Sequence, residues 1–161
     1  MTAKDMLVAW LNDAHGMENS LIQVLNHQIK GAKDYPQVQA KLEEHLEQTR
    51  RHAQLVQDCV EKLGGRISPV KTGMATLLGQ LQSVSTGTAP DEMMKNALSD
   101  YAAECFEVAS YTALVQAANA LGEQRVAQVC QQILQEDDAM ARWIHQNLPS
   151  LAQQTLQQAT K

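Results

Sequence analysis

The chain has 161 residues, of which 44% are hydrophobic and 19% are charged, a composition that suits one folded domain and argues against general disorder. The net charge of −5 argues against a nucleic-acid-binding protein, because affinity for phosphates needs a basic surface. No apolar run approaches the ~18 residues of a membrane-spanning helix, the N-terminus lacks a signal-peptide pattern, and three dispersed cysteines predict a reduced, cytoplasmic protein.

Helix-breaking residues divide the chain into four long segments. Only 4% of the residues are aromatic, and glycine and proline are few, which favours helix over sheet. Gly122 occupies the position of a helix C-cap, and Pro149 is predicted to stop the last helix. The predicted helices span residues 3–30, 36–63, 91–121 and 123–147.

The buried side of each predicted helix follows from apolar residues at helical spacing. The first stripe contains Leu7, Leu11, Ala14, Glu18, Leu21 and Leu25. The second contains Leu42, Leu46, Thr49, Ala53, Val56, Val60 and Leu63. The third contains Leu98, Tyr101, Cys105, Val108, Thr112 and Val115. The fourth contains Val126, Val129, Ile133, Asp137, Met140, Ile144 and Leu148.

The linker between the second and third predicted helices is long, at residues 64–90, and its centre at 74–81 is expected to form a short apolar helix. Two tight hairpins joined by one long crossover form the connectivity of ferritin-like bundles, whereas an up-down-up-down bundle needs only a short loop. We therefore predict an all-α, ferritin-like four-helix bundle over residues 1–149. The polar residues 150–161 are predicted to form a tail or a short helix.

Each predicted helix carries acidic residues on or beside its apolar stripe, where an unpaired carboxylate is costly to bury. Glu18 lies seven residues from both Leu11 and Leu25, in the middle of the first stripe. The other candidates are Glu47 in the second helix, Glu104 and Glu107 in the third, and Glu136 or Asp137 in the fourth.

These candidates are expected at one height in the bundle. Glu18 precedes the first turn, near residue 33, by about 15 residues, and Glu47 follows it by about 14. Glu107 precedes Gly122 by 15 residues, and Asp137 follows it by 15. At 1.5 Å per residue, each acid lies ~21–23 Å from its own turn, at the middle of a bundle ~45 Å long. Four converging carboxylates repel one another unless they are protonated or bind cations, so the pattern predicts a dinuclear iron or manganese site.

The alternative is that some of these acids face solvent. Glu47 lies in the run Glu43–Glu44–His45–Leu46–Glu47, and Glu136 is followed by two further acids. Charge-rich runs of this kind are usually exposed faces, so only the coincidence of four equal heights favours one shared site.

Four segments carry a family pattern: WLNDAHGME at residues 10–18, HLEQT at 45–49, FEVASYT at 106–112 and ARWIHQNLP at 141–149. In order and spacing these segments resemble the bacterial YciE/YciF family, with closer similarity to its YciE branch. The resemblance extends over nearly the whole chain. It implies a rubrerythrin-like four-helix bundle that is usually dimeric and is associated with bacterial stress responses.

The resemblance also implies a metal pattern, from which this chain departs. The pattern places acidic ligands at Glu18, Glu47, Glu104, Glu107 and either Glu136 or Asp137. It implies a histidine three residues after Glu47, where this chain has Arg50. The wider superfamily has another histidine three residues after the last acid, where this chain has Ala139 or Met140. Arginine cannot ligate a cation and itself neutralises carboxylates, so a degenerate site is expected, either metal-bound or metal-free.

The remaining histidines, the cysteines and the tryptophans allow further expectations. His15, one turn before Glu18, is a candidate replacement ligand, whereas His52 is expected on a different face. The other histidines, His27, His45 and His145, are expected at the surface or at an interface. The cysteines, Cys59, Cys105 and Cys130, are expected to be buried and inert. The tryptophans, Trp10 and Trp143, are expected to anchor packing or a dimer.

Two functions follow from these observations. The first is a ferritin-like protein with a degenerate di-iron or manganese site and a role in stress protection. Its chemistry would be oxidation of ferrous iron or reduction of peroxide, with Glu104 or Glu107 bridging the metals. Its terminal ligands would be Glu18, Glu47 and Asp137. The second is a metal-free, non-enzymatic bundle that acts through a homodimer or a partner protein. A ferritin-type storage cage is a weaker third possibility.

Overall fold

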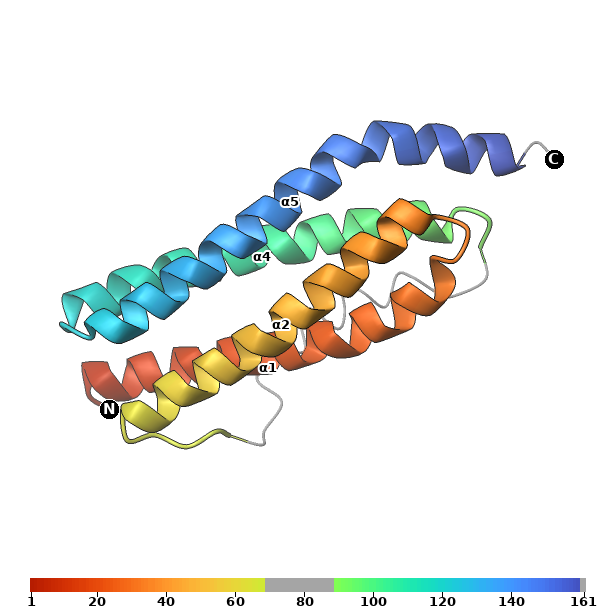
Figure 1. The fold of residues 1–161 in the computed structure, drawn as a ribbon. Helices are drawn as coiled ribbons and strands as arrows, with labels where there is room; N and C mark the ends of the chain where they lie inside the picture. Colours follow the sequence, from red (N-terminus) through yellow and green to blue (C-terminus); the bar gives the residue numbers. More distant parts are fainter. Residues whose placement is uncertain (69–88, 160–161) are drawn as a thin grey trace.

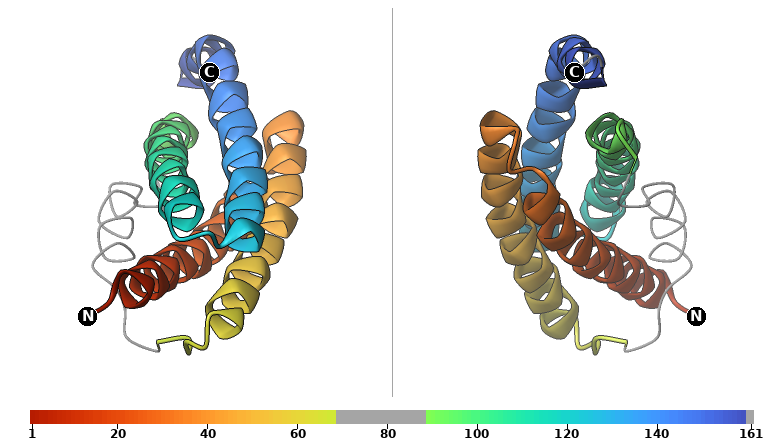
Figure 2. Two further views of the ribbon diagram at one scale, coloured as in Figure 1. Left: turned by 90° about the vertical axis from the view of Figure 1, so that its left-hand side faces the viewer. Right: turned by 90° about the vertical axis from the view of Figure 1, so that its right-hand side faces the viewer.

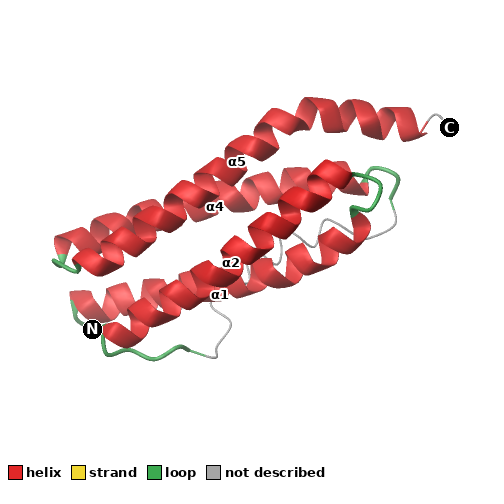
Figure 3. Ribbon diagram, in the orientation of Figure 1, coloured by secondary structure: helices red, strands yellow, loops and turns green. Residues whose placement is uncertain are grey.

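The computed structural model describes residues 1–68 and 89–159, which form four helices (Figure 1). These are α1 (Ala3–Gly31), α2 (Pro36–Lys62), α4 (Glu92–Ala120) and α5 (Gln124–Ala159). No strand occurs in these two stretches (Figure 3). The predicted all-α bundle is confirmed, and the helices begin within a residue of the expected positions. The short helix expected at residues 74–81 lies outside the described residues.

The helices form two antiparallel hairpins that pack against each other. The main contacts are those of α1 with α2 and of α4 with α5, and the hairpins meet where α1 contacts α4 and α2 contacts α5. The α1–α2 turn and the α4–α5 turn lie at opposite ends of the bundle (Figure 1). The end-on views show the four helices arranged around one long axis (Figure 2). This arrangement is the one predicted for a bundle with a single long crossover.

Local signals explain where the helices begin and turn. The Thr2 side chain caps α1, and the Asp5 carboxylate accepts a hydrogen bond from the Thr2 backbone in return, which forms a capping box. Pro36 stands in the first turn of α2, where its missing N–H costs nothing. Gly64 and Gly122 follow α2 and α4 with φ values of 81° and 71°, a conformation that other residues adopt only with strain.

The interior consists of two apolar clusters with a polar layer between them. One cluster includes Leu11, Val56 and Ile133, and the other includes Leu25 and Ile144. Charged and polar side chains with less than a tenth of their surface exposed occupy the middle of the bundle. They are Glu18, His45, Thr49, His52, Glu104, Glu107 and Asp137. None of the four helices that the structure describes is long and apolar enough to cross a membrane.

The buried side of α4 differs from the prediction. Leu98 is 50% exposed and Cys105 is also exposed, although both belong to the stripe expected in the core. The buried side carries Asn96, Asp100 and Glu104 instead. Apolar residues occur on both sides of this helix, so their spacing does not identify the side that faces the core. Cys59 and Cys130 are buried as expected, and the expected burial of Cys105 is wrong.

The last helix does not stop at Pro149. Instead α5 bends and continues to Ala159, so residues 150–159 extend the bundle rather than forming a free tail (Figure 1). Leu151 and Thr155 are buried, and the Tyr35 hydroxyl donates a hydrogen bond to Gln158 Oε1 at 2.6 Å. A proline inside a helix costs one backbone hydrogen bond and bends the axis. Here the bend turns apolar residues of α5 toward the α1–α2 turn, and their burial offsets that cost.

Candidate metal centre

Four carboxylates converge in the polar layer. They come from three helices, with Glu18 on α1, Glu104 and Glu107 on α4 and Asp137 on α5, and each is only 1% exposed. The possible ligand atoms form two groups, and within each group all atoms lie within 4.8 Å of one another. The first group consists of Glu18, His52 and Asp137, and the second of Glu104, Glu107 and Asp137. Because Asp137 belongs to both groups, two ions held by these groups would share its carboxylate.

The layer contains buried polar atoms that have no hydrogen-bond partner within residues 1–68 and 89–159. They belong to the five side chains of the two groups, and they are Glu18 Oε2, His52 Nδ1, Glu104 Oε2, both carboxylate oxygens of Glu107, and Asp137 Oδ2. Leaving one such atom unsatisfied costs about 1–3 kcal/mol, and more when it is charged. Carboxylate oxygens and an imidazole nitrogen are the donor atoms that iron and manganese bind in proteins. The residues present therefore fit a pair of such ions.

His52, on α2, is buried beside the acids of the other three helices. Its Nε2 lies 2.9 Å from Glu136 Oε2, and its Nδ1 lies 3.6 Å from both Glu18 Oε2 and Asp137 Oδ1. A proton on Nε2, donated to Glu136, leaves the Nδ1 lone pair directed at the two buried carboxylates. Metal-bound histidines are oriented in this way by an acceptor on their other nitrogen. Burial lowers the pKa of His52, but the carboxylates of Glu18 and Glu136 outweigh it and raise the pKa.

His45 makes the second buried imidazole contact. It is 1% exposed, and its Nε2 lies 2.8 Å from Glu104 Oε1. Burial lowers the pKa of His45, but the neighbouring Glu104 carboxylate and the Gln48 side chain outweigh it and raise the pKa to about 9. His45 is therefore protonated at neutral pH without metal, and it neutralises one carboxylate of the layer.

Two other carboxylates of the layer, those of Glu107 and Asp137, have raised pKa values. Burial is the largest cause of the raised pKa of Glu107, followed by the charges of Glu18 and Asp137. Burial likewise raises the pKa of Asp137, followed by the charge of Glu18. The Tyr111 hydroxyl donates to Glu18 Oε1 at 2.5 Å, and burial together with the charge of Glu18 raises the pKa of Tyr111. The metal-free layer thus favours protons on Glu107 and Asp137, and divalent cations would compete with those protons.

The structure brings together four of the five predicted ligands. Glu18, Glu104, Glu107 and Asp137 all lie in the layer. The side chain of Glu47, in contrast, is 68% exposed and pairs with Arg50 on the surface, so the expectation that it shares the site is wrong. The height estimate did not consider which face of the helix carries Glu47. Two residues are about 200° around a helix, so Glu47 points away from the side that Thr49 buries.

The structure also differs from what was expected for Arg50 and for three of the histidines. Arg50 forms its ion pair outside the layer, so it does not replace a cation there. His15 is half-buried and contacts Asn19 rather than a carboxylate of the layer. His45 and His52, expected at the surface or on another face, are buried. Both share a face with Thr49, at four and three residues from it, and this spacing was the signal that would have revealed them.

Comparison with known proteins places the chain in a family. The family model described as "Domain of unknown function (DUF892)" matches residues 2–157. The chain belongs to this family. A structure of a protein from Xanthomonas campestris pv. campestris is 32% identical, with a TM-score of 0.85, and covers 99% of this chain and 100% of its own.

Two further structures show the fold at lower identity. The E. coli stress protein YciF is 20% identical with a TM-score of 0.73, covering 100% of this chain and 99% of its own. The Desulfovibrio desulfuricans bacterioferritin, described with a diiron site, is 20% identical with a TM-score of 0.79, covering 98% of this chain and 87% of its own. These similarities confirm the ferritin-like, YciF-type fold that the sequence predicted.

Proposed function

We propose that the polar layer binds two divalent cations, iron or manganese, and that the protein acts in stress protection through this centre. One observation carries the proposal: six buried ligand atoms without partners converge from all four helices on two adjacent positions. A purely structural layer would pair these atoms with one another or with donors, because each unpaired atom destabilises the fold.

The charges of the layer also support a pair of cations. Its four carboxylates carry a charge of −4 when ionised, and two divalent cations carry +4. Desolvating four carboxylates without such compensation is prohibitive, so without metal they must hold protons or bind the imidazolium of His45. Burial is the main cause of the raised pKa of Glu107 and Asp137, and two bound ions would remove the repulsion that adds to it.

Each side chain has a distinct role in the proposed centre. Asp137 would bridge the two ions, because it belongs to both ligand groups. The tyrosine hydroxyl of Tyr111 orients Glu18, and Glu136 orients His52 through the nitrogen that faces away from the centre. A bound iron or manganese pair supplies one-electron redox chemistry, and oxidation of ferrous iron or reduction of peroxide is the activity that we propose.

The biological setting is proposed from similarity. The YciF neighbour is described as a stress protein, which supports a role in stress protection for this chain. We place the chain in the YciE branch on the segments that resemble it, and we propose a cytoplasmic homodimer. Light scattering after size exclusion should give about twice the chain mass of 17.8 kDa, and a mass near 18 kDa would contradict the dimer.

Metal content tests the proposal. Protein purified without chelator, and again after anaerobic loading with Fe²⁺ or Mn²⁺, should hold about two ions per chain by mass spectrometry. Glu18→Gln should lose at least one of them, because it removes a charge from the first ligand group. Glu47→Gln is the matched control, an acid-to-amide change on the surface, and should retain both. An empty wild-type protein under both conditions would overturn the metal centre.

One observation favours the metal-free alternative, an interaction protein. The outer face of α4 exposes apolar side chains, including Leu98, and Cys105 beside them. A protein that needs this face and no metal would keep its stress-protective effect after replacement of all the buried acids. The loss of that effect in a folded Glu18→Gln variant would decide for the metal.

A further inference from the structure

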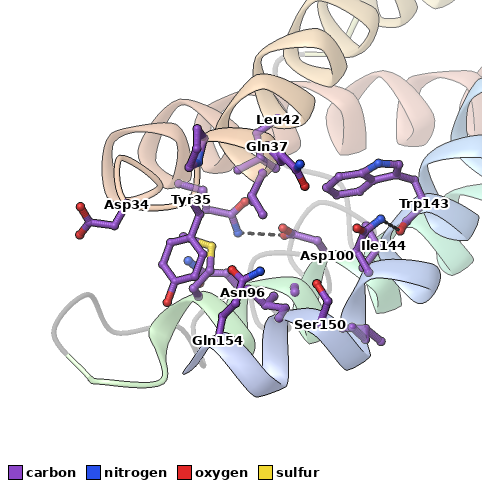
Figure 4. Close-up of a pocket in the computed structure, with 18 of the residues that line it drawn as sticks. Asp34, Tyr35, Gln37, Leu42, Asn96, Asp100, Trp143, Ile144, Ser150 and Gln154 are labelled. Carbon is purple, nitrogen blue, oxygen red and sulfur yellow. Dashed lines mark hydrogen bonds between the residues drawn. The ribbon is translucent and has the colours of Figure 1, made fainter. Parts of the chain in front are cut away.

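A cavity of about 260 Å³ opens at the end of the bundle where α1 turns into α2 (Figure 4). Tyr35 and Trp143 stand on opposite sides of it, and Asp100 lies between them. The continuation of α5 past Pro149 supplies one wall through Leu151, so the bend in this helix creates the cavity.

The floor of this cavity is polar and acidic. Gln28 and Asp100 are 4% and 5% exposed, and Gln28 Nε2 donates to Asp100 Oδ1 at 2.8 Å. This hydrogen bond fixes the amide, and Gln28 Oε1 is left without a partner. Neither Lys, Arg nor His is among the described residues that line the cavity, whereas Asp34 and Asp100 are. The cavity therefore attracts cations and repels anions.

The cavity floor and the metal centre share one feature, buried side-chain atoms without a hydrogen-bond partner among the described residues. Among the described residues, Gln28 Oε1 is the one unpartnered buried side-chain atom that does not belong to the centre. Every unpartnered oxygen in both places is an acceptor, so the interior offers a series of positions for a positive charge. No donor in the described part of the chain satisfies these positions.

On two helices, residues that line the cavity are about one turn away from residues of the centre. On α4, Asp100 precedes Glu104 by four residues, a rise of about 6 Å. On α5, Met140 lines the cavity three residues after Asp137, a rise of about 4.5 Å. The carboxylates of the centre are each 1% exposed, so an ion must pass between the helices to reach them.

We propose that this cavity is the entrance through which a divalent cation reaches the metal centre, with Asp100 and Gln28 as its first binding site. The proposal rests on the proposed function. The cavity has room for a divalent cation with its bound waters, because one water needs only about 10–15 Å³ of such a cavity volume. The ion then meets the unpartnered Oε2 of Glu104, while His45 keeps its bond to Oε1.

The rate of Mn²⁺ uptake tests the role of Asp100. Free Mn²⁺ is followed by its electron paramagnetic resonance signal after rapid mixing with the full chain. Asp100→Asn keeps the shape of the side chain and removes its charge, and should slow uptake tenfold or more without changing the final content. Asp58→Asn is the control: it removes an exposed acid on α2, outside the cavity, and this variant should load at the wild-type rate. Wild-type uptake by a folded Asp100→Asn variant would overturn the entrance.

A second measurement does not depend on the centre. The chain has two tryptophans, so Trp10→Phe leaves Trp143 in the cavity wall as the only one. In the double variant Trp10→Phe, Glu18→Gln, added Mn²⁺ should quench Trp143 fluorescence in a saturable way, and a further Asp100→Asn change should abolish the quenching. Saturable quenching with a wild-type centre that stays empty would overturn the proposed function and keep the cavity as a cation site. A centre that fills without any quenching would overturn the entrance and keep the centre.

Discussion

His52 contacts buried and surface carboxylates at the same time. Its Nδ1 faces Glu18 and Asp137, while its Nε2 bonds to Glu136, which Arg51 also contacts at 2.6 Å. A single imidazole thereby connects the proposed centre to an ion pair at the protein surface. A residue that hydrogen-bonds to a metal ligand and orients it affects metal affinity without contacting the metal.

Glu136→Ala should therefore weaken Mn²⁺ binding by about 10- to 100-fold, because the His52 ring loses the acceptor that fixes its orientation. Titration calorimetry with Mn²⁺ measures the change in Kd. Glu47→Ala is the control, since it removes an exposed acid of the neighbouring helix that has no contact with the layer. Equal affinities for the two variants would contradict the positioning role.

Tyr111 makes the other contact that orients a carboxylate. Tyr111→Phe should lower the free energy of unfolding by about 1.5–3 kcal/mol in chelator, because a buried hydrogen bond to a carboxylate is lost. Urea unfolding followed by circular dichroism measures this change. The control is Tyr101→Phe, a half-buried tyrosine on the outer side of α4, where the expected loss is below about 0.5 kcal/mol. A loss for Tyr111→Phe as small as the control would show that its hydroxyl does not stabilise Glu18.

At the scale of elements, α5 closes the end of the bundle where α1 turns into α2. Beyond Pro149 it covers the α1–α2 turn, where Leu151 packs in the same apolar cluster as Tyr35 and Leu25. From their polar, glutamine-rich composition, residues 150–161 were predicted to form a tail or a short helix. The buried positions Leu151 and Thr155 are four residues apart, so one narrow apolar stripe is enough to hold this segment.

Leu151→Ala should consequently destabilise the protein by about 2–4 kcal/mol, the usual cost of removing a buried leucine side chain. Leu156→Ala changes the same residue type five positions later, where the side chain is 71% exposed, and should cost less than about 0.5 kcal/mol. Unfolding midpoints in urea give both values. Similar losses for the two variants would mean that residues 150–159 do not pack as a structural part of the bundle.

The buried face could be predicted from the sequence for some helices but not for others. In α1 and α2 one face is apolar and the other is polar, so the buried stripes, including Glu18 and Thr49, were predicted. In α4 both faces carry apolar residues, and the buried face holds the acids, so spacing identified the wrong side. The fold and the four buried acids of the layer thus followed from the pattern, whereas the burial of His45 and His52 depends on tertiary contacts.

At the scale of the whole molecule, the buried titratable groups make stability depend on pH. The pKa of Asp100 is raised by burial from 3.8 to about 7, and that of His45 rises from 6.5 to about 9 because Glu104 outweighs its burial. Glu107 and Asp137 have raised pKa values as well. The folded chain therefore binds more protons than the unfolded chain between about pH 4 and pH 9.

A group with a raised pKa stabilises the fold fully below its unfolded pKa, and this contribution is lost as the pH rises through its folded value. We therefore expect the free energy of unfolding of the metal-free protein to fall between pH 5 and pH 9. For Asp100 alone, a shift of about three pH units corresponds to as much as about 4 kcal/mol, lost by the time the pH passes 7. Glu136, whose pKa is lowered by its contacts with His52, opposes this trend only at acidic pH.

Urea unfolding in chelator at pH 5, 6, 7, 8 and 9 measures this dependence. Asp100→Asn cannot ionise, so its stability should fall less steeply between pH 5 and pH 7 than that of the wild type. Saturating Mn²⁺ should stabilise the protein more at pH 8 than at pH 5, because the ions displace protons from the same carboxylates. Stability that rises with pH in chelator would contradict the proton-bound layer, and an unchanged profile in Mn²⁺ would show that metal and protons do not share these sites.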